Sequence, residues 1–192
     1  MKCAIILSAA VFAGMAFVQA EEPVDLNGSF EKCRADSKGF VAPEGWVKDK
    51  QSKGVKFSAA TEEARTGKFA FYAEAEERSL AHIYYRNAVI NAQAGETVTF
   101  TVYGKGSGTF QMGAIAYSDE EKSRFVCTLA GKQQKITDGE NWKKFTFSIP
   151  VVKRKRNGRE YTKLQLRPAI IIRGAGEFVL DDLTYEKRGT AE

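Results

Sequence analysis

The chain has 192 residues, of which 29 are Lys or Arg, 24 are Asp or Glu and one is His, for a formal net charge of +5. This charge is mild and spread along the chain, so we expect no nucleic acid as a partner. The chain is long enough for one domain with a full core. With a single histidine, His82, the chain cannot build a two-histidine zinc site.

The first twenty residues have the pattern of a secretory signal peptide. A charged start at Lys2 is followed by an apolar run from Cys3 to Val18 and a small-residue cleavage site at Ala20. The apolar run is too short to favour a membrane-spanning helix. We therefore expect a mature chain that begins at Glu21, has a net charge of +4 once Lys2 is removed, and is secreted or carried to the periplasm or cell surface without a membrane span.

Apolar and polar residues alternate in segment after segment, and a period of two predicts strands with one buried face. The alternating segments are 68–73, 96–103, 109–117, 143–149 and 163–167. Turn signals that separate strands stand at 66–67, 94–95, 104–108, 138–139 and 157–158. Only 59–65 and 73–78 have weak helical character, and we expect loops or single turns there.

About ten short antiparallel strands in one domain predict two packed sheets, because a single sheet would leave its hydrophobic face in water. The sequence thus predicts an all-β domain over residues 21–187, an antiparallel two-sheet β-sandwich of the jelly-roll type, with a short tail at 188–192. We expect it to be a monomer.

Two cysteines, Cys33 and Cys127, remain after removal of the leader. In an oxidising compartment they either pair or stay as buried free thiols, and the sequence leaves both alternatives open. A bridge between them would close a loop of about a hundred residues and add about 4 kcal/mol of stability.

Acidic residues stand near both ends of the mature chain. Asp181 and Asp182 interrupt the last predicted strand, and Glu31 ends a short first one. If these strands lie side by side, the acids can share one hard, oxygen-liking cation, which points to a structural calcium ion (Ca²⁺). The alternative is that they are solvated or paired with lysines.

Five short segments follow one another in a recognisable order. They are 27–31 (Asn-Gly-Ser-Phe-Glu), 43–46 (Pro-Glu-Gly-Trp), 94–105, 142–147 and 180–183 (Leu-Asp-Asp-Leu). In order and spacing they resemble jelly-roll carbohydrate-binding modules of the CenC type, in the galactose-binding-domain-like superfamily, over nearly the whole mature chain. The resemblance implies a structural calcium near the first and last strands and a glycan on an open sheet face. It carries no ligand identity, since such sandwiches also serve as adhesins and structural modules.

Sugar recognition in water uses flat aromatic rings beneath the apolar faces of sugars, with amide, carboxylate and guanidinium groups for the hydroxyls. Alternation along 96–103 buries Val98, Phe100 and Val102 and turns Tyr103 outward. The same logic exposes Gln111, Tyr117, Gln165 and Arg167, while Tyr84 comes from a less clearly phased strand. The glycan-binding candidates are Tyr84, Tyr103, Gln111, Tyr117, Gln165 and Arg167. The expected partner is a polysaccharide or oligosaccharide.

One basic run stands out, made of Lys153, Arg154, Lys155, Arg156 and Arg159. The Asn-Gly pair at 157–158 accepts positive φ, which predicts the tip of a long hairpin with arms at 145–152 and 161–172. Arginine suits bidentate contact with sulfate or carboxylate groups, so the run is a candidate for binding an anionic polysaccharide. A solvated loop is the alternative.

The sequence contains no Gly-x-Ser-x-Gly elbow, phosphate-binding glycine loop or nucleophilic-cysteine signature, so we assign no catalytic residue. We expect a secreted, non-catalytic glycan-binding module. One alternative is a structural or adhesive cell-surface protein, which a broad flat apolar patch would indicate. The other is a glycoside hydrolase, which would show two carboxyl groups about 5 to 10 Å apart in a groove.

Overall fold

The computed structural model describes residues 24–189 except 38, 121 and 138, and every regular element in that part of the chain is a β-strand. The strands are β1 (Cys33–Ala35), β2 (Val41–Pro43), β3 (Trp46–Lys48), β4 (Lys53–Ala60), β5 (Ala70–Tyr85), β6 (Ile90–Gln93), β7 (Thr97–Ser118), β8 (Phe125–Ala130), β9 (Gln134–Ile136), β10 (Lys143–Pro150), β11 (Arg154–Arg156), β12 (Arg159–Tyr161), β13 (Lys163–Arg173) and β14 (Gly176–Arg188). No helix in these residues is long and apolar enough to cross a membrane. The expected signal peptide, residues 1–20, lies outside the described residues.

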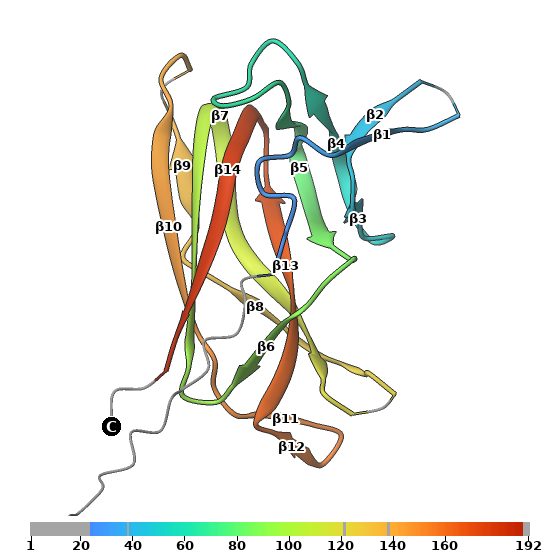
Figure 1. Cartoon of the computed structure of the whole chain (residues 1–192), viewed down its shortest axis with the longest axis vertical. Helices are drawn as coiled ribbons and strands as arrows, with labels where there is room; N and C mark the ends of the chain where they lie inside the picture. Colours follow the sequence, from blue (N-terminus) through green and yellow to red (C-terminus); the bar gives the residue numbers. More distant parts are fainter. Residues whose placement is uncertain (1–23, 38, 121, 138, 190–192) are drawn as a thin grey trace, which may run out of the picture.

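Two long strands, β5 and β7, run through both layers of the sandwich (Figure 1). In the first sheet β14 lies between the first halves of β5 and β7, with β4 and β10 on either side. In the second sheet β13 lies between the second halves of the same two strands, and β3, β6, β8 and β9 complete it. All pairs are antiparallel, which confirms the predicted all-β sandwich.

Glycines form the corner at which β7 passes from one sheet to the other. Gly106 and Gly108 have φ angles of 107° and 147°, which residues with a Cβ rarely adopt. A Cβ on Gly176, at the start of β14, would lie 2.6 Å from the Cα of Gly108. The turn expected at 104–108 is therefore wrong: this glycine-rich segment bends one continuous strand, because the close approach of β14 leaves room only for glycine.

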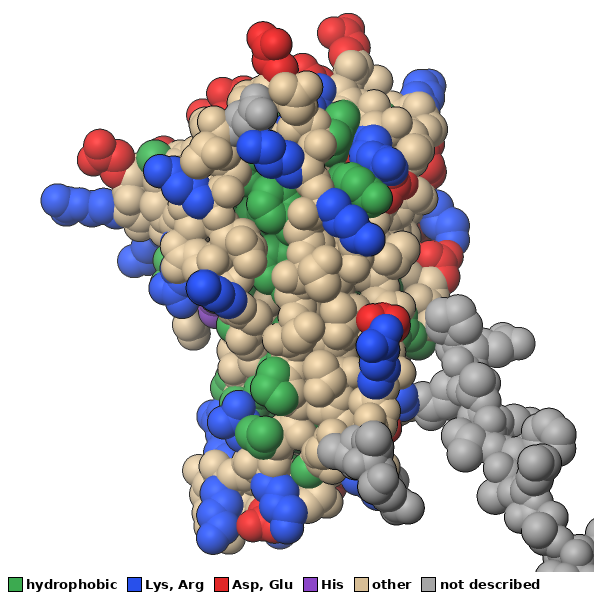
Figure 2. Space-filling model, turned by 90° about the vertical axis from the view of Figure 1, so that its left-hand side faces the viewer, with side chains coloured by type: hydrophobic (Ala, Val, Ile, Leu, Met, Phe, Trp, Pro, Cys, Tyr) green, Lys and Arg blue, Asp and Glu red, His purple; other side chains and the backbone are tan. Residues whose placement is uncertain are grey.

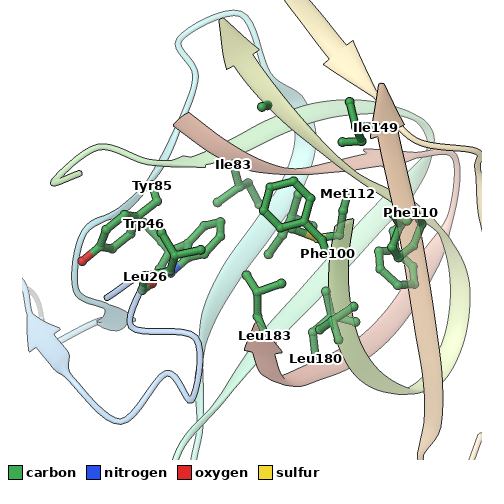
Figure 3. Packing of buried hydrophobic residues seen from close by; sticks show 14 of the residues in the cluster. Leu26, Trp46, Ile83, Tyr85, Phe100, Phe110, Met112, Ile149, Leu180 and Leu183 are labelled. Carbon is green, nitrogen blue, oxygen red and sulfur yellow. Dashed lines mark hydrogen bonds between the residues drawn. The ribbon is translucent and has the colours of Figure 1, made fainter. Parts of the chain in front are cut away.

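The inward side chains of both sheets form one core, part of which Figure 3 shows. Val98, Phe100 and Val102 are fully buried, as the alternation predicts. Phe110 packs against Phe178 of β14 with the ring centroids 5.6 Å apart, so side chains from the two sheets interdigitate. Deleting a buried phenylalanine side chain of this kind typically costs about 3–5 kcal/mol.

The two cysteines are unpaired. Cys33 lies in the β1–β2 hairpin and Cys127 in β8, and both thiols are free and half-buried. Burial raises the pKa of each thiol. The structure thus has the free thiols, one of the two alternatives that the sequence left open.

The basic run forms a short hairpin of its own. Asn157 and Gly158 connect β11 to β12 with φ angles of 50° and 76°, which confirms the predicted turn. The long arms expected at 145–152 and 161–172 are wrong, because β10 pairs with β7 in the first sheet whereas β13 lies in the second. The hairpin therefore connects the two layers at one end of the sandwich (Figure 1).

Candidate functional site

Five of the six glycan-binding candidates lie together on the outward face of the second sheet. The strand register places Tyr117 opposite Gln165 and Gln111 opposite Ile171, while Tyr84 lies opposite Ala169. We call this surface the β13 face and define it by Tyr84, Gln111, Ile115, Tyr117, Gln165, Arg167, Ala169 and Ile171. The shared phase of β7 and β13 brings these residues together, because alternate positions of neighbouring strands point the same way.

The floor of the β13 face is apolar but closed. Ile115, Ala169 and Ile171 form a small cluster separate from the main core, and each is at most 6% exposed. Tyr84 and Tyr117 pack against this cluster and remain half-buried. The face is therefore not the broad exposed apolar patch that an adhesive surface would show.

Two adjacent aromatic rings lie between two arginines along one side of the β13 face. The guanidinium of Arg167 lies over the ring of Tyr117, 4.9 Å from its centroid. Tyr117 meets Phe125 of β8 edge to face at 6.2 Å, and the guanidinium of Arg156 lies 4.6 Å from the centroid of Phe125. This arginine–aromatic row joins the basic hairpin to the sheet face, so two regions predicted separately form one surface.

Two arginines near this row have unsatisfied hydrogen-bond donors. Among the residues that the structure describes, the Nε atoms of Arg154 and Arg167 are buried without a hydrogen-bond partner. A buried donor left unpaired costs about 1–3 kcal/mol, so native proteins rarely leave one without an acceptor. The guanidinium of Arg167, one of these two, lies over the Tyr117 ring on the β13 face.

The basic hairpin is only partly neutralised. Arg156 donates through Nη1 to the carbonyl of Val126 at 2.9 Å, which holds the hairpin against β8. Arg159 pairs with Glu120 at 3.3 Å and Lys153 with Glu160 at 3.7 Å. Figure 2 shows the Lys and Arg side chains gathered at this end of the molecule, with an acidic side chain among them.

Arg154 and Arg156 also approach the partly buried thiol of Cys127. Burial raises the pKa of this thiol, and the two arginines act in the opposite direction. Together with the carbonyl contact to Val126, this places the basic run beside β8 and not free in solvent as a separate loop.

Two sequence expectations for the face need correction. Tyr103 does not join the other candidates, because the corner in β7 places it in the first sheet, where the guanidinium of Arg65 lies 3.7 Å from its ring centroid. Gln111 points to the predicted side but is only 8% exposed, because it lies beside the closed apolar floor. Its amide is therefore not the freely exposed group that the alternation predicts.

Phe125 was missed from the sequence. It begins β8 after a polar segment, so alternation gives it no clear phase, and a register irregularity beside Tyr117 turns it toward that ring.

His82 lies opposite Ile171 on the neighbouring strand and points to the same outward side. Burial lowers its pKa and Arg173 adds to this effect, while Asp49 opposes it.

The three acids expected to bind calcium all contact one loop in the first sheet. Glu31 accepts backbone N–H bonds from Lys68 (2.8 Å) and Phe69 (2.9 Å) through Oε1. Asp181, which is fully buried, accepts those of residues 65 and 66 at 2.8 and 3.1 Å. The backbone of the last strand also reaches the first segment, since the amide of Leu183 donates to the carbonyl of residue 28 at 2.8 Å.

Asp182 contacts the side chains of the same loop, whereas Asp181 accepts its backbone N–H groups. Its carboxylate forms an ion pair with Arg65 and accepts a hydrogen bond from the hydroxyl of Thr66 at 2.6 Å. Its φ of 51° marks the bulge in β14.

Burial raises the pKa of Asp181, although three backbone N–H groups lower it. Among the described residues, no three acidic, histidine or cysteine side chains form a ready metal-binding group. A calcium ion here would therefore need backbone oxygens beside the carboxylates.

Comparison with known proteins identifies the fold. No family model matches the sequence, and no curated protein sequence matches it. Among solved structures, the chain is similar to the CBM22-1 xylan-binding domain of Paenibacillus barcinonensis Xyn10C, with a TM-score of 0.51 and 16% identity over 85% of this chain and 94% of that one. It is also similar to the CBM22-1 and GH10 modules of a Clostridium thermocellum xylanase (TM-score 0.50, 15% identity, 76% of this chain), of which it spans 26%.

A third similar structure is an enzyme. It is a Stig cyclase of Fischerella sp. TAU in complex with an indole compound, with a TM-score of 0.56 and 14% identity over 88% of this chain and 98% of that one. At such identities the likeness concerns the fold alone. The chain thus has the β-sandwich fold of carbohydrate-binding modules, a fold that also carries catalysis, so function must be argued from the site.

Proposed function

We propose that this protein is a secreted glycan-binding module that holds an acid-bearing polysaccharide on the β13 face. The observation that carries the proposal is the row of Arg156, Phe125, Tyr117 and Arg167 along one side of that face. Aromatic rings provide flat surfaces for the apolar faces of sugars, and guanidinium groups provide directional donors for oxygen acceptors. The xylan-binding domain of similar fold is an example of such a sandwich that binds a polysaccharide.

The composition of the face favours binding over hydrolysis. Its defining residues are Tyr, Gln, Arg, Ile and Ala, so the face itself carries no carboxyl group. A glycosidase of the common kind needs two carboxyl groups on either side of the scissile bond. Glutamine amides such as that of Gln165 can donate to and accept from sugar hydroxyls, which is the chemistry of recognition.

Two observations favour an acidic ligand. The Nε donor of Arg167 is buried and unpaired, and a guanidinium binds carboxylate or sulfate through two parallel hydrogen bonds. Arg156 lies at the other end of the row, so both ends of the row carry a positive charge. Attraction of this kind is screened by salt, and we therefore expect affinity to fall as ionic strength rises.

Calcium keeps a separate, structural part in this proposal. Glu31, Asp181 and Asp182, which all contact the 65–69 loop, would hold the ion together with nearby backbone oxygens, and the ion would tie both ends of the domain to that loop. The loop connects β4 to β5 and contacts β14 in the first sheet, whereas the β13 face belongs to the second sheet. Removal of calcium should therefore lower the free energy of unfolding, while glycan binding by the folded protein stays unchanged.

Affinity electrophoresis through gels containing single polysaccharides tests the proposal. Polygalacturonate and κ-carrageenan provide carboxylate and sulfate groups, and β-1,4-galactan is the neutral comparison. We expect retardation by at least one acidic polymer, weakened at least about tenfold, or about 1.4 kcal/mol, in Tyr117→Ala. Retardation by none of them, or equal retardation of wild type and Tyr117→Ala, contradicts the proposal.

Trp142→Ala is the matched control for this experiment. Trp142 is also a partly buried ring beneath a cation, with the Lys105 ammonium 5.3 Å from its centroid, but it lies beside the first sheet. Its replacement should leave retardation unchanged. Thermal melts of both variants separate a loss of the site from a loss of the fold.

A further inference from the structure

A pocket beneath the β1–β2 hairpin continues the β13 face. Tyr84 of β5 lies opposite Val47 of β3, so the outward side of the sheet extends one strand further. Val47 lines a pocket of about 510 Å³ whose other wall is the hairpin, which stands out from the body beside β3 and β4 (Figure 1). Phe40 and Arg34 line this pocket from the hairpin, and Arg86 lines it from the residue after β5.

The pocket combines an exposed ring with polar groups of both signs. Phe40 is 45% exposed, so its ring is accessible to a ligand in the pocket. Arg34, Arg86 and Asn87 provide donors, and the carboxylates of Asp36 and Glu44 also line the walls. A ring for the apolar face of a sugar, with donors and acceptors for its hydroxyls, is the composition of a saccharide site.

The distance between the arginine–aromatic row and the pocket sets the length of a ligand that contacts both. Tyr117 and Tyr84 are separated by four residues along β13, from Gln165 to Ala169, and by two strand spacings across the sheet. At about 3.3 Å per residue and about 4.8 Å per strand spacing, their backbones lie about 16 Å apart. Since Val47 is one spacing beyond Tyr84, the path from the arginine–aromatic row to the pocket is about 20 Å long. Only a chain of several sugar units spans it.

We propose that this pocket is a further binding site that takes one sugar unit from the polysaccharide chain whose acidic groups lie on the β13 face. The inference rests on the proposed function. Phe40 packs against the sugar ring, while Arg34, Arg86 and Asn87 hydrogen-bond its oxygens. Chain length thereby becomes a determinant of affinity, because short fragments cover the row or the pocket and not both.

Calorimetry with galacturonate oligomers of three and eight units tests this inference. For wild type we expect the octamer to bind at least about tenfold more tightly than the trimer. In Phe40→Ser and in Arg86→Ala this preference should fall to about threefold or less, whereas trimer binding is unchanged. Leu80→Ser and Arg188→Ala are matched controls, since Leu80 is equally exposed (43%) but lies outside the pocket and Arg188 ends β14.

The outcomes separate the two proposals. An octamer preference that both pocket variants retain, while Tyr117→Ala abolishes binding of both oligomers, overturns the inference and leaves the proposed function standing. Equal affinity of wild type for trimer and octamer also overturns it. Binding of neither oligomer contradicts both proposals for carboxylate-bearing chains.

Discussion

The buried carboxylate of Asp181 ties the 65–69 loop to the last strand, and Asp181→Asn tests that role. Its Oδ2 accepts the backbone N–H groups of Arg65 and Thr66, and its Oδ1 accepts that of Asp182 at 2.7 Å. Asparagine has the same shape but replaces one acceptor oxygen with an NH₂ donor, so at least one buried N–H loses its partner. Such a loss costs about 1–3 kcal/mol.

We therefore expect Asp181→Asn to lower the free energy of unfolding by about 1–3 kcal/mol in urea titrations at neutral pH. In a domain of this size each kcal/mol corresponds to about 2–4 °C in melting temperature. Glu186→Gln is the control, because it removes an exposed carboxylate from the same strand, paired at the surface with Arg188, and should cost less than about 1 kcal/mol. A variant as stable as wild type would refute this role of the carboxylate.

The same variant has a pH signature. Burial raises the pKa of Asp181 above its usual 3.8, so the folded protein takes up a proton at higher pH than the unfolded chain does. Protonation then stabilises the wild type as pH falls from the folded pKa toward 3.8, and Asp181→Asn lacks this gain. The stability difference between the two proteins should widen over that interval, and a constant or shrinking difference would show that the pKa is not raised.

Three further predictions concern the framework. Calcium should raise the melting temperature and a chelator should lower it, since calcium at a hundred times its dissociation constant adds about 2.7 kcal/mol to the free energy of unfolding. A melting temperature that neither calcium nor a chelator changes contradicts a bound structural calcium. Gly176→Ala should lose about 1–3 kcal/mol in urea titrations, because its Cβ would meet backbone atoms of Ser107 and Gly108, whereas Gly139→Ala, with open space around it, should not; equal stability of the two variants argues against the glycine corner. The pKa of Tyr72, raised to about 12 by burial and by its hydrogen bond to Glu177, should appear as one late-titrating phenol in ultraviolet titrations that Tyr72→Phe removes; an unchanged titration curve in the variant means that another tyrosine is responsible.

The sequence predicts which side of a strand a residue faces, but it does not predict which residue of a neighbouring strand lies opposite. Alternation alone placed Tyr117 and Gln165 on outward sides, because the side-chain period of a strand is two. That they lie opposite each other depends on the register between β7 and β13, which local pattern does not encode. The acids near both chain ends could be expected to approach one another, but their common partner, the 65–69 loop, could not.

The wrong expectations for Tyr103 and for the 104–108 turn share one cause. Tyr103 and Tyr117 point to the same side of one strand, yet the corner at Gly106 and Gly108 puts them in different sheets. A glycine-rich segment looks like a turn between strands whether the chain reverses or only bends, because both need φ values open to glycine. The loop or turn expected at 73–78 is wrong for a different reason: these residues lie in β5, between the part that pairs with β14 and the part that pairs with β13, although their alanines and charges gave no strand pattern.

The Nε–H group of Arg167 offers the most direct test of acid-bearing glycan recognition. Its resonance can be observed in ¹H–¹⁵N nuclear magnetic resonance spectra and assigned by its absence from Arg167→Lys. On titration with the galacturonate octamer, we predict that this resonance shifts and that its exchange with water slows, because the buried donor gains an acceptor. An Arg167 signal that stays unchanged at saturation, while resonances elsewhere in the protein move, would contradict the assignment of the β13 face as the glycan site.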